Sequence, residues 1–358
     1  MAGNVIVCGF SGLEAPSTVH RWLSEESVAG LILFKRNIDD VEQAAALIAS
    51  CTARRDSTLP ILVCVDQEGG RVARFGEPVL RLPPMRMLAA AGNPQLTRDA
   101  AMVLGRQLRA IGVNLDFAPV LDVDTNPQNP VIGDRAFGGT PDVVAEHALA
   151  FAEGLHDGGV LSCGKHFPGH GDTDIDSHLA LPTLRHDRTR LDEVELRPFQ
   201  AAAKRIPSVM TAHVVFEAVD PDVPATMSRA AVSQLLREEI GFEGAVFSDD
   251  LEMKAVTERY AIEEAGVLAI EAGCDLLLVC SDLEAAARLR ETLATEAGRN
   301  ERFRARLVDA RSRADALRQR IGELPPPLPL QNALESAEAQ SVKKRLEQLE
   351  HDLVGVLS

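Results

Sequence analysis

The sequence predicts an α/β fold: a (β/α)8 TIM-type barrel in a single domain, with a short helical extension at the C-terminus. Three observations support this prediction. The chain has 358 residues, which is long enough for one large barrel. Short apolar runs alternate with longer amphipathic stretches, as they do in a series of βα units. No GxGxxG motif follows an early strand, which disfavours a dinucleotide-binding open sheet, the main alternative.

Eight apolar runs are expected to form the strands. They are continuous rather than alternating, which is typical of parallel strands that are covered on both faces. The runs are residues 5–9, 30–34, 61–65, 113–117, 161–164, 208–212, 245–248 and 275–280. The stretches between them favour helices, because their apolar residues recur at helical spacing. These stretches are residues 40–50, 95–111, 141–157, 228–240, 262–272 and 283–297.

The end of the chain has a different composition. Residues 302–324 are expected to form a final helix, so that the barrel domain covers residues 1–324. The proline-rich run 325–329 then interrupts the chain, and residues 325–358 are predicted to be a helical extension. Apolar residues of this extension fall near helical spacing, which favours packing on the barrel wall; an oligomer contact is the alternative.

Composition excludes several classes of partner. A formal net charge of −16 repels phosphate backbones and anionic lipids, so we expect neither nucleic acid nor membrane as a partner. No apolar run is long enough to cross a bilayer, and the first residues lack the features of an export signal. The six cysteines include no CxxC pair and favour small buried side chains in a reducing compartment. A cytoplasmic location is therefore expected.

Ionisable residues follow five of the eight runs, and this recurrence predicts a site. Asp66, Lys165, His213 and Asp249 each lie at or just beyond the end of a run. Catalytic residues of TIM barrels sit at the C-terminal ends of the strands, so these side chains are expected to meet at one mouth.

The segment 165–178 is the richest in polar groups and has no helical pattern. A zinc site built from His166, His170, His178 and an aspartate is one alternative for it. However, the spacing matches no compact zinc motif, and Lys165 would repel a cation. We therefore expect a catalytic loop, with no metal and no other cofactor. Its glycines allow such a loop to fold over a substrate.

Four segments resemble glycoside hydrolase family 3, and within it the bacterial β-N-acetylglucosaminidases of the NagZ type. They are VDQEGGRVARF at 65–75, IGDRAF at 132–137, KHFPGHGDTDIDSH at 165–178 and FSDDLEM at 247–253. The resemblance runs from about residue 5 to about residue 320 in the expected order. No recognised motif lies beyond Pro325.

This resemblance implies roles for individual residues. Asp249 matches the nucleophile, His178 the general acid/base and Asp176 its partner. The residues that match those holding the N-acetylglucosamine ring are Asp66, Arg74, Arg135, Lys165 and His166. His213 ends a strand near the site and is expected to line the pocket. Asp250 is expected to cap the N-terminus of the following helix.

The implied activity is that of a retaining exo-β-N-acetylglucosaminidase acting in peptidoglycan recycling. The substrate would be a small saccharide or muropeptide in which N-acetylglucosamine is linked to 1,6-anhydro-N-acetylmuramic acid, and the enzyme would be a monomer or homodimer. One alternative is a broad β-glycosidase of the same family, which the histidine-containing loop disfavours. The others are a metal-dependent barrel hydrolase and a non-catalytic sugar-binding protein. The set of Asp249, Asp176 and His178 argues against the last, because binding needs no nucleophile.

Overall fold

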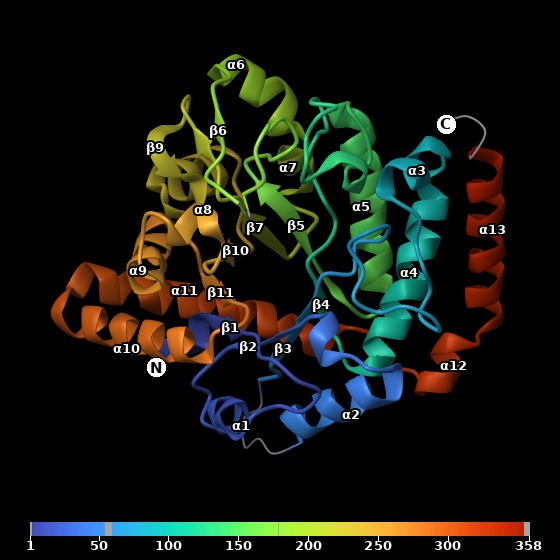
Figure 1. Ribbon diagram of the computed structural model, residues 1–358, viewed down its shortest axis with the longest axis horizontal. Helices are drawn as coiled ribbons and strands as arrows, with labels where there is room; N and C mark the ends of the chain where they lie inside the picture. Colours follow the sequence, from blue (N-terminus) through green and yellow to red (C-terminus); the bar gives the residue numbers. More distant parts are fainter. Residues whose placement is uncertain (1, 54–58, 178, 354–358) are drawn as a thin grey trace.

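The protein is built around a closed barrel of eight parallel strands, seen in the computed structural model in Figure 1. The structure describes residues 2–53, 59–177 and 179–353. Neighbouring strands follow the order β1-β11-β10-β7-β5-β4-β3-β2 around the barrel. Their bounds are β1 (Ile6–Cys8), β2 (Gly30–Leu33), β3 (Leu62–Val65), β4 (Leu115–Asp116), β5 (Leu161–Phe167), β7 (Ser208–Thr211), β10 (Ala245–Asp250) and β11 (Leu276–Val279). The predicted TIM-type barrel is thereby confirmed.

Two strands extend further than their apolar runs. In β5, pairing continues to Phe167, which lies beside Thr211 of β7, and in β10 it continues to Asp250, which lies beside Leu278 of β11. Lys165 was expected to begin a loop, and Asp249 was expected at the end of a strand. Both lie on hydrogen-bonded strands, so the barrel itself fixes their positions.

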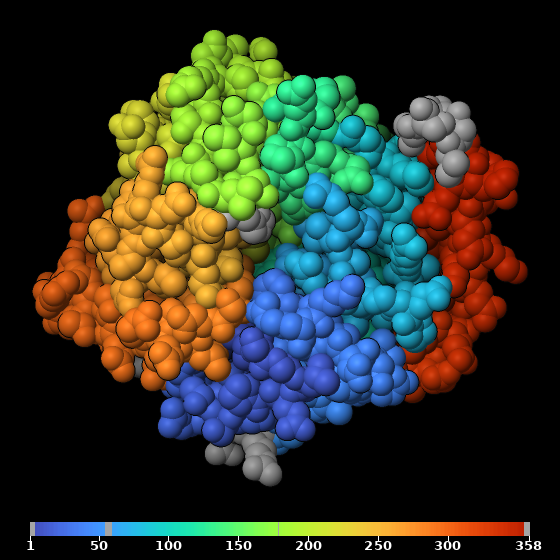
Figure 2. All heavy atoms as spheres, in the orientation of Figure 1, coloured from blue at the N-terminus to red at the C-terminus, as the bar shows by residue number. Residues whose placement is uncertain are grey.

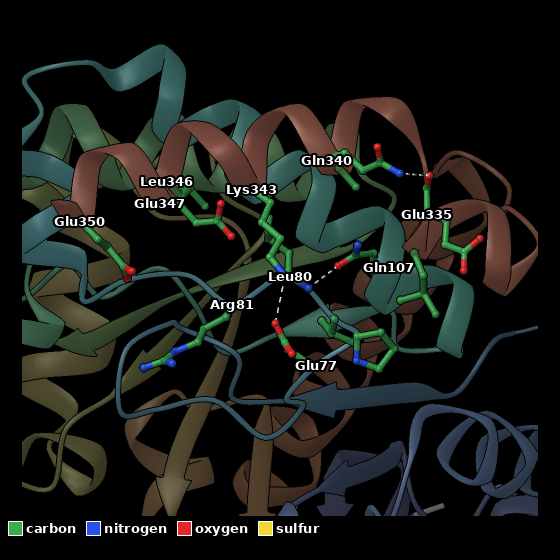
Figure 3. A pocket seen from close by; sticks show the side chains of 14 residues that line it. Glu77, Leu80, Arg81, Gln107, Glu335, Gln340, Lys343, Leu346, Glu347 and Glu350 are labelled. Carbon is green, nitrogen blue, oxygen red and sulfur yellow. Dashed lines mark hydrogen bonds and ion pairs between the residues drawn. The ribbon is translucent and has the colours of Figure 1, made fainter. Parts of the chain in front are cut away.

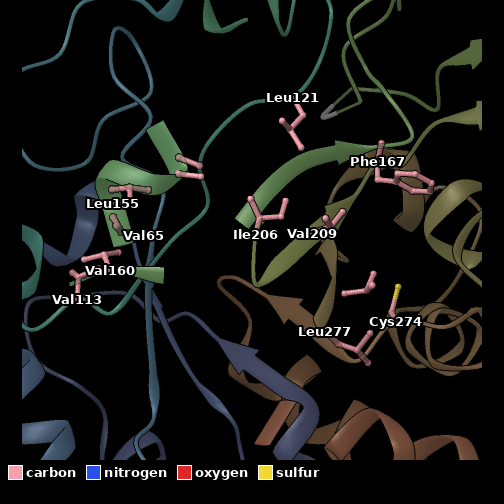
Figure 4. Packing of buried hydrophobic residues seen from close by; sticks show 14 of the residues in the cluster. Val65, Val113, Leu121, Leu155, Val160, Phe167, Ile206, Val209, Cys274 and Leu277 are labelled. Atoms are coloured by element: carbon pink, nitrogen blue, oxygen red, sulfur yellow. The ribbon is translucent and has the colours of Figure 1, made fainter. Parts of the chain in front are cut away.

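The apolar side chains of the barrel form two layers. One layer fills the interior and includes Leu62, Leu115, Phe117 and Phe247; the last two rings meet edge to face with centroids 5.2 Å apart. The other lies between the strands and the surrounding helices, and Figure 4 shows part of it. Burial on both faces explains why the strands appear as continuous apolar runs.

Helices surround the barrel. They are α1 (Ser17–Ser24), α2 (Val41–Thr52), α3 (Met85–Ala90), α4 (Pro94–Ile111), α5 (Pro141–Asp157), α6 (Arg188–Arg190), α7 (Arg197–Ala202), α8 (Lys254–Thr257), α9 (Ile262–Ala272), α10 (Leu283–Arg299) and α11 (Glu301–Arg320). The segment expected as a helix at 228–240 is a π-helix over Ala230–Glu239. None of the described helices is both long and apolar enough to cross a membrane. All six cysteines are buried and free, and their burial agrees with the prediction.

A second, three-stranded sheet was not predicted. It consists of β6 (Thr183–Leu184), β8 (Val215–Phe216) and β9 (Asp220–Pro224), in the order β6-β8-β9. Strands β6 and β8 have two residues each and leave no periodic pattern, and the five residues of β9, DPDVP, include two prolines, which disfavour a strand. The sheet joins the segments that follow β5 and β7.

The chain after the proline-rich run forms α12 (Leu330–Leu334) and α13 (Ala337–Leu353). Figure 1 shows α13 lying along the outside of α4, and the contacts between these helices agree. Val342 and Leu346 of α13 are buried. The expected packing on the barrel wall is therefore observed for the described part of this segment.

Candidate active site

A cavity of about 190 Å³ opens at the carboxyl ends of the barrel strands. Its charged lining residues are Asp66, Glu68, Arg74, Arg135, Lys165, Asp249 and Asp250. Figure 2 shows a hollow near the middle of the molecule, bordered by blue, green and orange segments. Pockets for drug-sized ligands measure roughly 300–1,000 Å³. A cavity of this size suits a single small ring rather than a polymer.

Ion pairs link the strand ends inside the cavity. Lys165 Nζ lies 2.8 Å from Asp66 Oδ1 and 2.6 Å from Glu68 Oε1. Arg135 makes a two-pronged contact with Glu68, with Nη2 at 2.8 Å from Oε1 and Nε at 2.9 Å from Oε2. Arg74 Nη2 lies 3.0 Å from Asp66 Oδ2. The network therefore joins β3, β5 and the segment after β4 through alternating charges.

This network keeps buried groups ionised. Burial alone would raise the pKa of Asp66, but Lys165 and Arg74 outweigh it and hold that pKa below its usual value. Arg135 and Lys165 lower the pKa of Glu68 strongly against the same effect of burial. The cavity thus presents charged acceptors and donors together. Arg74 Nε is buried and has no hydrogen-bond partner among the described residues.

His166 is oriented by an aspartate that lies behind it. Its Nδ1 lies 2.7 Å from Asp122 Oδ2, and Asp122 Oδ1 accepts hydrogen bonds from the N–H groups of His166 and His170. Burial would raise the pKa of Asp122, but His166 lowers it. An ionised Asp122 favours the proton on Nδ1 of His166. The same ring lines the cavity.

Asp249 and Asp250 are adjacent on β10 and have different surroundings. Asp249 Oδ1 accepts a hydrogen bond from the Asp250 N–H at 2.8 Å, and Asp249 lines the cavity. Asp250 Oδ1 accepts from the N–H groups of Glu252 and Cys280, at 3.1 and 3.3 Å. The expectation that Asp250 caps the following helix is wrong, because Met253 occupies that position and Asp250 ties a turn to β11. Burial raises the pKa of Asp250 to about 7.

The loop after β5 is fastened to the barrel at several points. Asp172 accepts a hydrogen bond from the Thr125 hydroxyl at 2.6 Å and lies 2.5 Å from His186 Nε2. His170 contacts the hydroxyl groups of Thr173 and Ser177, at 2.7 and 2.9 Å. Burial lowers the pKa of His170 to about 4, so this imidazole is neutral and structural near pH 7.

These contacts place Ser177 at the cavity wall, and the Ser177 carbonyl also accepts a hydrogen bond from Ala255 N–H after β10. His178 follows Ser177 directly and lies outside the described residues. Asp176 precedes Ser177 in the same turn, where its carbonyl accepts from Leu179 N–H at 2.8 Å.

Residues 7–312 match the family described as "Glycosyl hydrolase family 3 N terminal domain". The chain belongs to glycoside hydrolase family 3.

Curated relatives in this family include a β-hexosaminidase from Alkalilimnicola ehrlichii, 42% identical over 287 residues, which are 78% of this chain and 81% of the relative. A β-hexosaminidase from Neisseria meningitidis is 42% identical over 277 residues, 75% of this chain and 76% of the relative. Together with the family match, these relatives identify the protein as a glycoside hydrolase, a β-N-acetylhexosaminidase.

Solved structures of the family agree. A family 3 β-N-acetylglucosaminidase from Paenibacillus sp. superposes with a TM-score of 0.90 at 40% identity, covering 97% of this chain and 68% of that chain. NagZ from Neisseria gonorrhoeae in complex with N-trifluoroacetyl-D-glucosamine gives a TM-score of 0.82 at 33% identity, covering 97% of both chains.

The structure of this family 3 chain brings most of the predicted site residues together. Those that line one cavity are Asp66, Arg74, Arg135, Lys165, His166 and Asp249. His213 is not among the lining residues and is fully buried. Its ring nitrogens lie 2.9 Å from the Thr226 hydroxyl and 3.0 Å from the Asp250 carbonyl. These contacts join His213 to the end of β10, and its role in substrate binding stays a prediction.

Two charged residues of the site were not predicted. Glu68 pairs with Lys165 and Arg135, and Asp122 orients His166. Both follow apolar runs closely, which was the available signal, but the sequence does not show which acids face which cations. Among the residues that the structure describes, no three His, Cys, Asp or Glu side chains are grouped as metal ligands.

Proposed function

We propose that this β-N-acetylhexosaminidase is a retaining exo-β-N-acetylglucosaminidase with Asp249 as its nucleophile. The observation that carries the proposal is the position of Asp249. Its carboxylate lies on β10 at the wall of a small cavity whose other walls carry the network of Asp66, Lys165, Glu68 and Arg135. A carboxylate on a strand is held rigidly, as a group that must attack one carbon atom requires.

The charged network is proposed to bind the sugar. Sugar hydroxyls both donate and accept hydrogen bonds, and the cavity offers ionised partners of both kinds, which form stronger bonds than neutral ones. Asp66 accepts, whereas Arg74, Arg135 and Lys165 donate. His166 presents its second ring nitrogen. A ligand of the same class occupies a similar structure, since NagZ from Neisseria gonorrhoeae was solved in complex with N-trifluoroacetyl-D-glucosamine.

The proposed reaction has two steps. In the first, Asp249 attacks the anomeric carbon, the bond to the leaving oxygen breaks, and protonated His178 transfers its proton to that oxygen. In the second, neutral His178 removes a proton from water, which attacks the anomeric carbon and releases Asp249 as a carboxylate. Histidine suits both steps because its ordinary pKa, roughly 6.5, lies near neutrality. Asp176, two residues before His178, is proposed to orient the imidazole.

The physiological substrate is proposed to be N-acetylglucosaminyl-1,6-anhydro-N-acetylmuramic acid, with or without its peptide, released during peptidoglycan recycling in the cytoplasm. The curated relatives named β-hexosaminidase support the sugar class. The size of the cavity supports an exo mode of action, in which one terminal sugar enters.

Two measurements test the proposal. Turnover of 4-nitrophenyl β-N-acetylglucosaminide should greatly exceed that of the β-glucoside; comparable rates would favour the broad β-glycosidase instead. A 5-fluoro-N-acetylglucosaminyl fluoride should trap a covalent adduct, and peptide mapping should locate it on Asp249. Labelling of Asp250 or of no residue would contradict the assignment of the nucleophile.

A further inference from the structure

The connection between β3 and α3, residues 66–84, carries Asp66 and Arg74 into the cavity, and we call it the substrate loop. Its inner part is fixed to the barrel by Gln67. The Gln67 N–H donates to Asp116 Oδ1 on β4 at 2.9 Å. The Gln67 side-chain oxygen accepts from the Arg74 N–H at 2.7 Å. The backbone that carries Arg74 is thereby tied to two strands.

The outer turn of the substrate loop, residues 77–81, is held by Gln107 of α4. Leu80 N–H donates to Gln107 Oε1 at 2.7 Å, and Gln107 Nε2 donates to the Ala333 carbonyl of α12 at 3.4 Å. Gln107 is only 1% exposed, so water cannot readily replace either partner. One buried amide therefore joins the substrate loop to the segment beyond the proline-rich run.

Helix α13 covers the same turn from outside. Figure 3 shows Lys343 reaching Glu77, with Nζ 3.0 Å from Oε1, and Gln107 meeting Leu80. Val79, Leu80 and Leu346 belong to one buried apolar cluster. A cavity of about 630 Å³ separates the rest of the turn from α12 and α13, so the contacts are few and specific.

We propose that the C-terminal segment, residues 325–353, positions the substrate loop through Gln107 and thereby sets the affinity for the sugar. Gln67 fixes the backbone at Arg74, and the C-terminal segment fixes the outer turn that follows it. Together they keep Arg74 3.0 Å from Asp66. This inference rests on the proposed function, because it takes these two residues to bind the sugar.

Without the segment, the turn becomes freer, and binding must first order it. The Michaelis constant then rises, whereas kcat changes little, since Asp249 lies on β10.

The test compares Gln107→Leu, which removes both hydrogen bonds, with Arg345→Met. Arg345 joins α13 to Asp99 of α4 at 2.7 Å and does not contact the substrate loop, so it is a matched control. For Gln107→Leu we expect a KM about 10-fold higher and a kcat within about 2-fold. Amide hydrogen exchange of residues 74–82 should be faster. Arg345→Met should leave both quantities unchanged. Lys343→Met, which removes the pair between α13 and Glu77 of the outer turn, should shift KM and exchange in the same direction.

Unchanged KM and unchanged exchange in Lys343→Met would show that the C-terminal segment does not position the loop. A lower unfolding temperature with unchanged KM and unchanged exchange of residues 74–82 would reduce Gln107 to a structural residue and overturn the inference. Failure of the proposed function gives a different result, because the unaltered enzyme would then not cleave the N-acetylglucosaminide. Hydrogen exchange would still report whether the segment orders the loop.

Discussion

Lys165 Nζ lies 2.8 Å from Asp66 Oδ1, so the ends of β5 and β3 are joined by an ion pair inside the cavity. The same ammonium group lies 2.6 Å from Glu68 Oε1. One lysine therefore compensates two carboxylates that are both largely buried, and its own pKa is raised by them against the effect of burial. Removing this cation leaves the two carboxylates facing each other with less compensation.

For Lys165→Met we expect kcat/KM to fall by about 100-fold or more, because the site loses a charged donor and the ion pairs that hold Asp66 and Glu68 in place.

The free energy of unfolding of Lys165→Met should fall as well. The pKa values of Asp66 and Glu68 are lowered in the folded state, so their stabilisation is present above their ordinary values of 3.8 and 4.5 and is lost as the pH falls. The unfolding temperature of Lys165→Met should therefore lie further below that of the unaltered enzyme at pH 7 than at pH 4. Lys204→Met, which removes an exposed pair with Glu243, is the control and should be nearly silent.

The contribution of Asp116 to the free energy of unfolding should depend on pH in the opposite direction. Burial raises its pKa from 3.8 to about 8, so between these values the folded state binds a proton that the unfolded state releases. The free energy of unfolding should fall through this window as the pH rises, by at most about 1.4 kcal/mol for each pH unit. Asp116→Asn should remove this slope and still accept the Gln67 N–H. Unfolding by urea at pH 5, 7 and 9 measures the effect; parallel curves for both proteins would contradict it.

The barrel was predictable from sequence because burial on both faces makes its strands continuous apolar runs. The same criterion ended two strands too early. The apolar runs end at Gly164 and Ser248 because polar residues follow, although strand pairing continues past Lys165 and Asp249. The residues at the mouth were predictable because strand ends in a barrel converge.

The pairing within the site was not predictable. Glu68 pairs with Lys165, which lies 97 positions later in the chain, and Asp122 pairs with His166, 44 positions later. Only the closed barrel brings the members of each pair together. The orientation of His213 depends likewise on tertiary contacts. Its ring turns toward Thr226 and the Asp250 carbonyl, which sequence position cannot reveal.

The two adjacent aspartates on β10 should respond differently to substitution. Asp249→Ala should lower kcat by about 10³-fold or more, because it removes the covalent route. Asp250→Asn should lower it by less than about 10-fold, since an amide oxygen can still accept from the N–H groups of Glu252 and Cys280. Steady-state turnover of both variants on one substrate is the measurement. The reverse order of effects would move the nucleophile to Asp250.

The role proposed for His178 can be separated from binding by varying the leaving group. His178→Ala should cripple cleavage of a natural sugar aglycone, which departs poorly without a proton. With a 2,4-dinitrophenyl leaving group, formation of the glycosyl-enzyme should be much less affected, because this phenolate needs no proton. Hydrolysis of the intermediate then becomes limiting, so a burst should appear.

Azide needs no general base to attack the glycosyl-enzyme, so it should accelerate turnover by His178→Ala and yield a glycosyl azide. Asp176→Ala should show a weaker form of both effects, because the imidazole remains but is less well oriented. His156→Ala, on the exposed side of α5, is the control and should behave as the unaltered enzyme. An equal loss of kcat/KM on every leaving group, without rescue by azide, would show that His178 serves binding or folding rather than proton transfer.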